Sequence, residues 1–576
     1  MNIRILTAIL LAIGTGAVAA EPEVHLPESV EKLDLAKADG IAILAGGRIK
    51  PLLVAATEGV QEIRGRSGLT RNLGPMRSWF ALALYGDTLS RQPIVFCANK
   101  PLRVELGLDP AGQFASFEQL ASNARLRQLT ETADAKDREK VRLSALEKAA
   151  RETARRLEKF AEARAGTSWR LLPGPAGREG LWRLPQEIPA EEMATNPALL
   201  ERATSIRTLL LAFAAGDQSR FDSAAQKLSR NEILVDSLSG LGEGQFLRTR
   251  PSHIRAESLL VSLRPFRWAW VLLMIAFLTA WIAQSLANTA PDSSRRLTMG
   301  AGTSAGIAFV LLAIGFALRV YVSGRAPVTN MYETTLWVGF GSMLFGLPIA
   351  WIYRSRSILS AVAAAGWVVF VLADNLPTVL DPSIKPLVPV LRNNFWLTLH
   401  VLTVTISYAA FLVAMAIGNL GLAQVFRKNS AEFQKTLSHY AYRAIQLGVL
   451  LLTCGIILGG VWADYSWGRF WGWDPKETWA LIADLGYLMV LHGRFSGWIR
   501  SFGTLMGSVL AFFGVVMAWY GVNFILASGL HSYGFSEGGA TAMGVFVIAQ
   551  GSFALVCYNQ LRKNLSRANN GGNSAA

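Results

Sequence analysis

The chain has 576 residues, of which 51% are hydrophobic and only 17% are charged, and its mean hydropathy is +0.31. This composition excludes an ordinary soluble enzyme and is typical of a polytopic membrane protein with one soluble portion. The net charge of +15 does not indicate nucleic-acid binding, because many lysines and arginines lie in short loops between apolar segments, where they set membrane topology. None of the three cysteines belongs to a Cys-x-x-Cys pair, which argues against a thiol–disulfide motif and a thiolate zinc site.

Residues 1–20 have the pattern of a signal peptide, which stays as an anchor if it is not cleaved. A basic residue near the start and a short apolar run precede small residues at 17–20. We therefore expect residues 21–264 to form an extracytoplasmic soluble domain. Its sequence shows no catalytic constellation, so its role is left open.

The extracytoplasmic domain is predicted to be mainly helical. Gly46-Gly47-Arg-Ile-Lys-Pro-Leu52 predicts a turn that leads into a helix. The charged, alanine-rich residues 123–165 carry apolar side chains at steps of three and four, which predicts an amphipathic helix, or one arm of a helical hairpin. A second helical region is expected at 196–229, with a break at Gly216-Asp217.

Residues 265–560 contain nine apolar segments, most of which approach the roughly 20 residues that a helix needs to cross a membrane. They are 266–287, 299–321, 332–353, 358–373, 396–425, 442–462, 478–492, 503–527 and 541–558. With the preceding domain outside, every loop predicted to be cytoplasmic carries Lys or Arg, which supports this orientation. It makes residues 561–576 a cytoplasmic tail. It also puts four loops on the outer face: 322–331, 374–395, 463–477 and 528–540. The predicted fold is thus all-α, with about nine transmembrane helices.

The loop at 463–477 has an unusual concentration of aromatic residues. In Trp467-Gly-Arg-Phe-Trp471-Gly-Trp473-Asp474-Pro-Lys-Glu477, three tryptophans and a phenylalanine fall within seven residues, separated by glycines. Tryptophan is common at membrane interfaces, but an aromatic belt needs only scattered residues at helix ends. The close spacing instead favours a flat aromatic floor for a flat apolar ligand.

Two histidines are predicted on the same face as this loop. His400 lies about one turn inside the outer end of the fifth segment, and His531 lies just past the outer end of the eighth. Neutral imidazole is a good iron ligand, so the pair predicts a haem held from both sides. His492, near the inner end of the seventh segment, is either an interfacial histidine or a ligand whose partner comes from another chain.

Charged residues of the outer face are candidates to contact the polar groups of such a ligand. Asp474 is expected to cap the helix that follows it, and Asp474 and Glu477 are also candidates to orient tryptophan N–H groups or a ligand histidine. Arg469, Lys476 and Arg325 are candidates to pair with haem propionates, which an apolar pocket alone would not accommodate.

At these residues the sequence resembles the tryptophan-rich WWD domain of haem-handling proteins. Within that superfamily it resembles CcsA, also called ResC, of the system II cytochrome c synthase, in an N-terminally extended form. Three further stretches are similar to CcsA and follow in the same order: Gly324-Arg-Ala-Pro-Val-Thr-Asn-Met-Tyr-Glu333, Trp396-Leu-Thr-Leu-His400-Val and Gly529-Leu-His531-Ser-Tyr-Gly. The resemblance extends over about 299–558.

The resemblance implies a cofactor, a function and partners. It implies that His400 and His531 ligate the iron of haem b at the WWD loop. It also implies that His492 belongs to an inner haem site, completed by a histidine of a separate CcsB (ResB) subunit. The implied complex is a holocytochrome c synthase, or haem lyase, of the bacterial cytoplasmic membrane. It would attach haem to the Cys-x-x-Cys-His segment of apocytochrome c, whose thiols a thioredoxin-like reductant would keep reduced. In that complex Trp467, Trp471, Trp473, Arg469, Asp474 and Glu477 are the candidate haem-binding residues of this chain.

Other functions compete with this hypothesis. A haem exporter or chaperone similar to CcmC would use the same loop and histidines without attaching haem. A haem b electron-transfer subunit would need histidine pairs within the helices on both sides of the membrane, and a solute transporter with an aromatic gate would show internal repeats. The sequence shows neither pattern.

Overall fold

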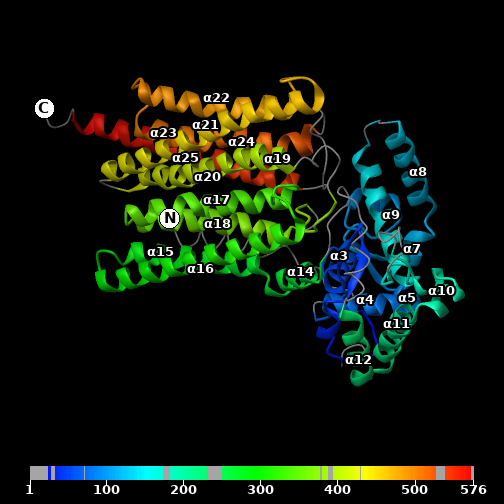
Figure 1. Cartoon of the computed structure of the whole chain (residues 1–576). Helices are drawn as coiled ribbons and strands as arrows, with labels where there is room; N and C mark the ends of the chain where they lie inside the picture. Colours follow the sequence, from blue (N-terminus) through cyan, green and yellow to red (C-terminus); the bar gives the residue numbers. More distant parts are fainter. Residues whose placement is uncertain are drawn as a thin grey trace. The chain divides into compact units, whose positions relative to one another are not determined.

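The structure, a computed structural model, describes residues 24–27, 33–70, 72–139, 141, 143–172, 182–230, 250–376, 379–386, 394–427, 430–526 and 539–572. The chain divides into two compact units, residues 1–261 and 262–576 (Figure 1). The predicted signal peptide, residues 1–20, lies outside the described residues.

The first unit is mainly helical, as predicted. Its α-helices, the last of which runs two residues past Val261, are α3 (Leu52–Arg64), α4 (Pro75–Leu84), α5 (Gly86–Leu89), α6 (Lys100–Glu105), α7 (Phe117–Ala121), α8 (Ala124–Arg138), α9 (Ala145–Arg164), α10 (Ala190–Thr195), α11 (Pro197–Ala215), α12 (Gln218–Ser229) and α14 (Pro251–Leu263). Short 3₁₀ turns lie at η1 (Ala36–Ala38) and η2 (Pro185–Glu187). Two antiparallel pairs of strands complete the described part of the unit: β1 (Ala42–Ala45) with β2 (Arg48–Pro51), and β3 (Pro93–Phe96) with β4 (Phe114–Ser116).

Capping residues set the helix boundaries in this unit. The predicted helix at 123–165 is two helices, α8 and α9. Asn123 caps the first, and a capping box of Ser144 and Glu147 starts the second. The predicted break in the second region is confirmed, because Gly216 ends α11 in a left-handed conformation and Asp217 caps α12.

The glycine turn predicted at 46–52 is a β-hairpin that directly precedes α3. Gly46 and Gly47 have φ values of 58° and 78°, which favour glycine, and they connect β1 to β2. Arg48 on β2 forms a two-pronged ion pair with Glu257 on α14, and the two side chains are only 2% and 5% exposed. Ala42, Trp182 and Ile254 form a small buried cluster, and Ile49 of β2 packs against it. The hairpin therefore fastens α14 to the first unit.

The second unit is a bundle of long helices that lie side by side (Figure 1). Its α-helices are α15 (Pro265–Ser285), α16 (Pro291–Ser323), α17 (Met331–Ile352), α18 (Arg356–Asn375), α19 (Asn394–Trp396), α20 (Leu402–Leu422), α21 (Ala431–Trp467), α22 (Pro475–Phe495), α23 (Ser501–Leu510), α24 (Phe512–Val516) and α25 (Ala540–Gly572). Two segments are π-helical, η4 (Leu397–Val401) and η6 (Met517–Leu526), and a 3₁₀ turn, η5 (Ala423–Phe426), follows α20.

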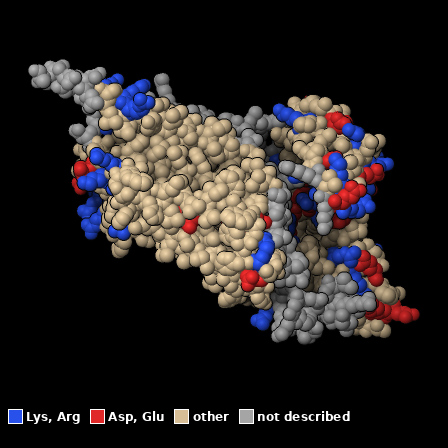
Figure 2. Space-filling model, turned by 90° about the horizontal axis from the view of Figure 1, so that it is seen from above, with Lys and Arg blue, Asp and Glu red and all other residues tan. Residues whose placement is uncertain are grey.

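Eight helices of the described residues are long and apolar enough to cross a membrane. The protein is therefore an all-α, multi-pass membrane protein. The bundle face seen in Figure 2 is largely uncharged along its middle, as contact with lipid requires. The predicted segment at 478–492 is not among the eight. It lies in α22, which carries Asp484 and His492 and whose 21 residues extend over about 32 Å at the rise of an α-helix.

Candidate functional site

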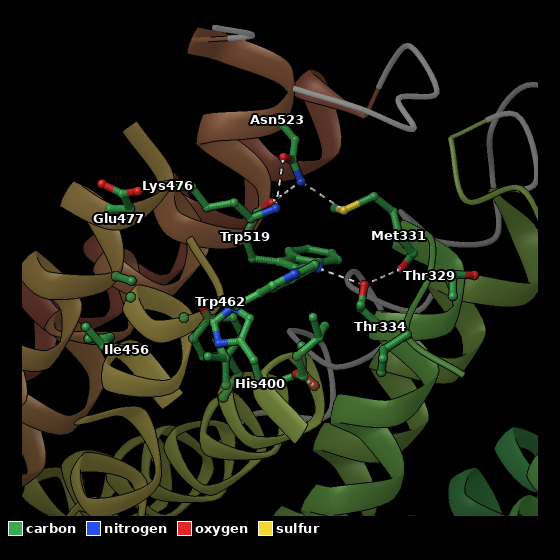
Figure 3. A pocket seen from close by; sticks show the side chains of 18 of the residues that line it. Thr329, Met331, Thr334, His400, Ile456, Trp462, Lys476, Glu477, Trp519 and Asn523 are labelled. Atoms are coloured by element: carbon green, nitrogen blue, oxygen red, sulfur yellow. Dashed lines mark hydrogen bonds between the residues drawn. The ribbon is translucent and has the colours of Figure 1, made fainter. Parts of the chain in front are cut away.

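A cavity of about 170 Å³ lies in the second unit where five segments meet (Figure 3). The segments are the approach to α17, the η4–α20 junction, the end of α21, the start of α22, and η6. Two loops that the sequence predicts on one membrane face, 322–331 and 463–477, both contribute to it. The lining is mainly apolar: Val328, Thr329, Asn330, Met331, Thr334, His400, Val401, Val404, Thr405, Tyr408, Ile456, Gly459, Gly460, Trp462, Phe470, Trp471, Lys476, Glu477, Ala480, Trp519 and Asn523.

His400 is the histidine of this lining, and its ring is held in one orientation. Its Nδ1 lies 2.8 Å from the carbonyl oxygen of Gly455 on α21. A carbonyl only accepts hydrogen bonds, so Nδ1 carries the proton and the lone pair of the neutral ring is on Nε2. This is the form of imidazole that coordinates a metal through Nε2. The ring also lies 5.6 Å from that of Trp462.

Glycines on α21 make room for this ring. A Cβ atom at Gly459 would lie 2.5 Å from Cε1 of His400, and one at Gly460 would lie 2.6 Å from the ring of Phe470. Both distances are far inside van der Waals contact, so a larger residue at either position would displace an aromatic ring of the cavity wall.

Both π-helical segments of the described residues line this cavity. η4 carries His400, and η6 carries Trp519 and Asn523. π-Helical turns are rare in proteins, but those that occur are often found at functional sites, because the extra residue redirects side chains. In η6 the Trp519 Nε1–H donates to Oγ1 of Thr334 at 3.2 Å, which joins this segment to α17.

The tryptophan loop is built on two helix ends. Gly468, with φ at 69°, ends α21 directly after Trp467. The expected cap at Asp474 is present, because its side chain accepts from the Lys476 backbone N–H at 3.0 Å. Glu477 completes the capping box and accepts from the N–H groups of Asp474 and Gly472. The carboxylate of Glu477 therefore fixes the shape of the loop.

The three tryptophans of the loop have different surroundings. Trp471 lines the cavity, whereas Trp467 and Trp473 do not. The rings of Trp471 and Trp473 are perpendicular, at 89° and 5.8 Å between centroids. The prediction of one flat aromatic floor is wrong for this pair. The backbone explains why: Trp473 has a φ of 56°, which turns its side chain outward, and 70% of it is exposed.

Arg469 and Arg325 do not line the cavity, and both side chains are engaged in other contacts. The Arg469 guanidinium lies 3.3 Å from Glu477 and 5.9 Å from the ring of Trp467. Arg325 donates to the carbonyl of Lys385 at 2.6 Å. Of the three cations predicted to meet propionates, Lys476 is the one that lines the cavity.

Lys476 points toward η6 from the start of α22 (Figure 3). Its Nζ lies 3.4 Å from Oδ1 of Asn523, and the Asn523 amide donates to the sulfur of Met331 at 3.2 Å. Desolvation lowers the pKa of Lys476 to about 8, against an opposing contribution from Asp474. A cation that has lost part of its hydration is available to an anionic group of a ligand.

The stretch from Gly324 to Glu333 is held by a buried ion pair. Arg319 on α16 lies 2.7 Å from Glu333 on α17, and the two side chains are 4% and 1% exposed. Glu333 also accepts from the N–H and hydroxyl of Thr329, while Asn330 caps α17. This network positions four consecutive residues of the lining, 328–331.

Sequence reasoning missed several residues that line this cavity. Trp462, Trp519 and Asn523 were not predicted. The one sequence signal among them is the position of Trp462, five residues before Trp467. His492 lies toward the opposite end of α22 from Glu477, is exposed, and donates from Nδ1 to the Leu488 carbonyl at 2.9 Å. His531 lies outside the described residues, so its role stays a prediction.

The fold and the cavity define an all-α, multi-pass membrane protein with a histidine-bearing, aromatic-lined pocket. Residues 328–531, which bracket this site, match the family model described as cytochrome C assembly protein.

Related proteins agree with this match. Over 302 residues the chain is 33% identical to the cytochrome c biogenesis protein CcsA of Synechococcus sp. (strain CC9902), covering 46% of this chain and 94% of that protein. It is 34% identical over 277 residues to CcsA of Chlorella vulgaris, covering 40% and 85%. It is also 30% identical over 502 residues to Protein NrfI of Wolinella succinogenes, covering 84% of this chain but 53% of NrfI. The chain therefore belongs to the CcsA family of cytochrome c biogenesis proteins and carries an N-terminal extension, as the sequence motifs predicted.

Proposed function

We propose that this chain holds haem b in the cavity, on the extracytoplasmic face, and presents it for covalent attachment to apocytochrome c. The observation that carries the proposal is His400: its ring enters an aromatic-lined cavity with the proton fixed on Nδ1 and the lone pair on Nε2. Family membership supports a role in cytochrome c biogenesis, and the haem-handling step is the proposal.

The residues of the cavity fit a haem. His400 offers an imidazole nitrogen to the iron, and the apolar lining suits the macrocycle. Because Gly459 and Gly460 have no Cβ, the rings of His400 and Phe470 pack directly against α21 and form part of the cavity wall. Lys476 provides a cation for carboxylate groups, which an apolar wall alone would exclude. When bound, haem would supply the iron and the two vinyl groups at which thioethers form.

The chain's own residues would act mainly by positioning. His400 holds the iron from one side, and His531 is proposed as the second ligand. Trp462, Trp471 and Trp519 exclude water from the macrocycle, while Lys476 orients its carboxylates. Fixed distance and orientation are sufficient to accelerate an addition between bound partners, so the chain need not supply a nucleophile.

The remaining partners belong to the same proposal. His492 is exposed on α22, beside the exposed side chains of Leu485 and Met489. We propose that a CcsB (ResB) subunit covers it and supplies the second ligand of an inner haem site. The complex would lie in a bacterial cytoplasmic membrane, with the first unit outside, and a thioredoxin-like reductant would keep the apocytochrome thiols reduced.

Co-expression tests the proposal directly. The chain, a CcsB partner and a c-type apocytochrome are produced in a host without its own maturation system, and covalent haem is stained. Covalent haem that disappears with His400→Ala supports the synthase function. The matched control is His439→Ala, which changes an exposed histidine of α21 that does not line the cavity.

Two other outcomes are informative. Haem that copurifies without covalent product favours a haem chaperone similar to CcmC. A purified chain without a haem spectrum, under reducing conditions and with the partner present, contradicts both functions.

A further inference from the structure

Asp484 is a carboxyl group inside the helix bundle that the proposed function does not use. It lies on α22, is 4% exposed, and accepts one hydrogen bond, from Oγ1 of Thr453 on α21 at 2.8 Å. Its other oxygen, Oδ1, is buried and has no hydrogen-bond partner among the described residues. Among the described residues, Asp484 forms no ion pair.

Within the part of the chain that the structure describes, the helices that pack against α22 bring no charged side chain to this carboxyl. α23 and α24 contain no titratable residue, and η6 contains only Tyr520. On α21, the titratable residue within one turn of Thr453 is Cys454, and on α22 itself it is Tyr487, whose hydroxyl donates to the Ser508 carbonyl at 3.3 Å. A buried carboxylate without a cation is costly, so this environment favours the neutral acid.

The carboxyl lies one helical turn from the cavity lining on both helices. On α22, Ala480 lines the cavity four residues before Asp484. On α21, Ile456 lines it three residues after Thr453, and residues three or four apart share a helix face. Gly455, which accepts the His400 proton, is two residues from Thr453. His400 and Asp484 are therefore hydrogen-bonded to the same turn of α21, His400 to the Gly455 carbonyl and Asp484 to the Thr453 hydroxyl.

We propose that Asp484 is a proton-binding site linked to the redox state of the iron at this cavity. The inference rests on the proposed function. Asp484 is protonated when the iron is ferrous. When a one-electron acceptor oxidises the iron, the Asp484 O–H bond breaks, its electron pair stays on the carboxylate and the proton passes to solvent. The net charge of the region is then unchanged. The neutral acid favours the ferrous state.

Redox titration at several pH values tests this linkage. In the purified chain with its partner and haem, equilibrated with redox mediators, the midpoint potential of the iron should fall as pH rises. Asp484→Asn, which preserves shape and accepts the Thr453 hydrogen bond, should abolish this slope. Asp464→Asn is the matched control, because Asp464 is exposed on α21, and the slope should persist.

Infrared difference spectroscopy gives a second readout that needs no variant. In protein labelled with ¹³C-aspartate, oxidation should remove a labelled band of a protonated carboxyl. A haem-bound chain with a pH-independent potential, or with no labelled carboxyl band that responds to oxidation, overturns the inference and leaves the proposed function standing. An unchanged slope in Asp484→Asn also overturns it. A wild-type chain that binds no haem overturns both.

Discussion

His400 donates its Nδ1 proton to the backbone carbonyl of Gly455, 2.8 Å away on α21. The acceptor is a main-chain group in the middle of a helix, so its position depends on the packing of α20 and η4 against α21 rather than on a flexible side chain. A Cβ at Gly455 would lie 2.6 Å from Val404, which shows how closely the two segments approach. Helix packing thus sets both the tautomer and the orientation of the His400 ring, the proposed iron ligand.

Gly459→Ala should disturb this arrangement without removing the ligand. The new Cβ would lie 2.5 Å from Cε1 of His400, so the ring must turn away from the Gly455 carbonyl. Loss of one hydrogen bond of about 1 kcal/mol predicts haem affinity lower by about five-fold. The measurement is haem titration followed by absorbance. Gly306→Ala on α16 is the control, since no atom lies within 4 Å of a Cβ there, and its haem affinity should equal that of the wild type. Equal affinities for all three proteins would contradict the prediction.

Lys476 predicts a pH dependence of ligand binding. Desolvation lowers its pKa to about 8, so its ammonium is charged below that pH and neutral above it. If the ammonium pairs with haem carboxylates, haem affinity should fall as pH rises through about 8. In Lys476→Met the affinity should be lower and should lose this pH dependence, and haem dimethyl ester, which lacks the carboxylates, should bind both proteins equally. A wild-type preference for haem over its ester that persists in Lys476→Met would contradict this role.

The same pKa shift has a consequence for folding. The pKa is lower in the folded chain than the ordinary value of 10.5, so between about pH 8 and 10.5 the unfolded chain binds more protons. The free energy of unfolding without ligand should therefore rise with pH in this window. Thermal unfolding of the wild type and Lys476→Met at a series of pH values measures the difference, and the variant should lack this contribution.

Trp473 allows function and stability to be separated. Its left-handed backbone costs a non-glycine residue roughly 1–2 kcal/mol, and its largely exposed side chain contributes little by burial within the chain. Trp473→Gly should therefore unfold at the same temperature as the wild type or higher. If the exposed ring serves haem presentation, covalent haem attachment should nevertheless fall. Trp498→Gly is a suitable control, since that tryptophan is 86% exposed outside the loop and attachment should be retained. Normal attachment by Trp473→Gly would show that this ring is dispensable.

The contents of the cavity were only partly predictable from the sequence. The apolar segments located the parts of the chain that carry or flank His400, Trp471 and Glu477. The Lys and Arg residues of the predicted cytoplasmic loops placed loops 322–331 and 463–477 on the same membrane face. The orientation of Trp473 depends on one backbone angle that no propensity indicates. Trp519 and Asn523 reach the site through a π-helical segment, which has no recognised sequence signature in this chain. The proton position on His400 depends on a carbonyl 55 residues away. Local sequence patterns thus predict where the helices lie, whereas the orientations of these side chains arise from packing between the helices.

The buried pair of Arg319 and Glu333 should be coupled in stability and in function. Glu333→Gln leaves the Arg319 charge buried with a neutral partner, and breaking such a pair costs about 3–5 kcal/mol. It also weakens the hydrogen bonds that hold Thr329 at the cavity wall. We expect a lower unfolding temperature and reduced haem affinity. In the double variant Arg319→Met, Glu333→Met no uncompensated charge remains, so its loss of stability should be smaller than the sum of the single losses. The cycle consists of the wild type, Arg319→Met, Glu333→Met and the double variant, and thermal unfolding of these four proteins in one detergent completes it. Strictly additive losses would show that the two side chains act independently.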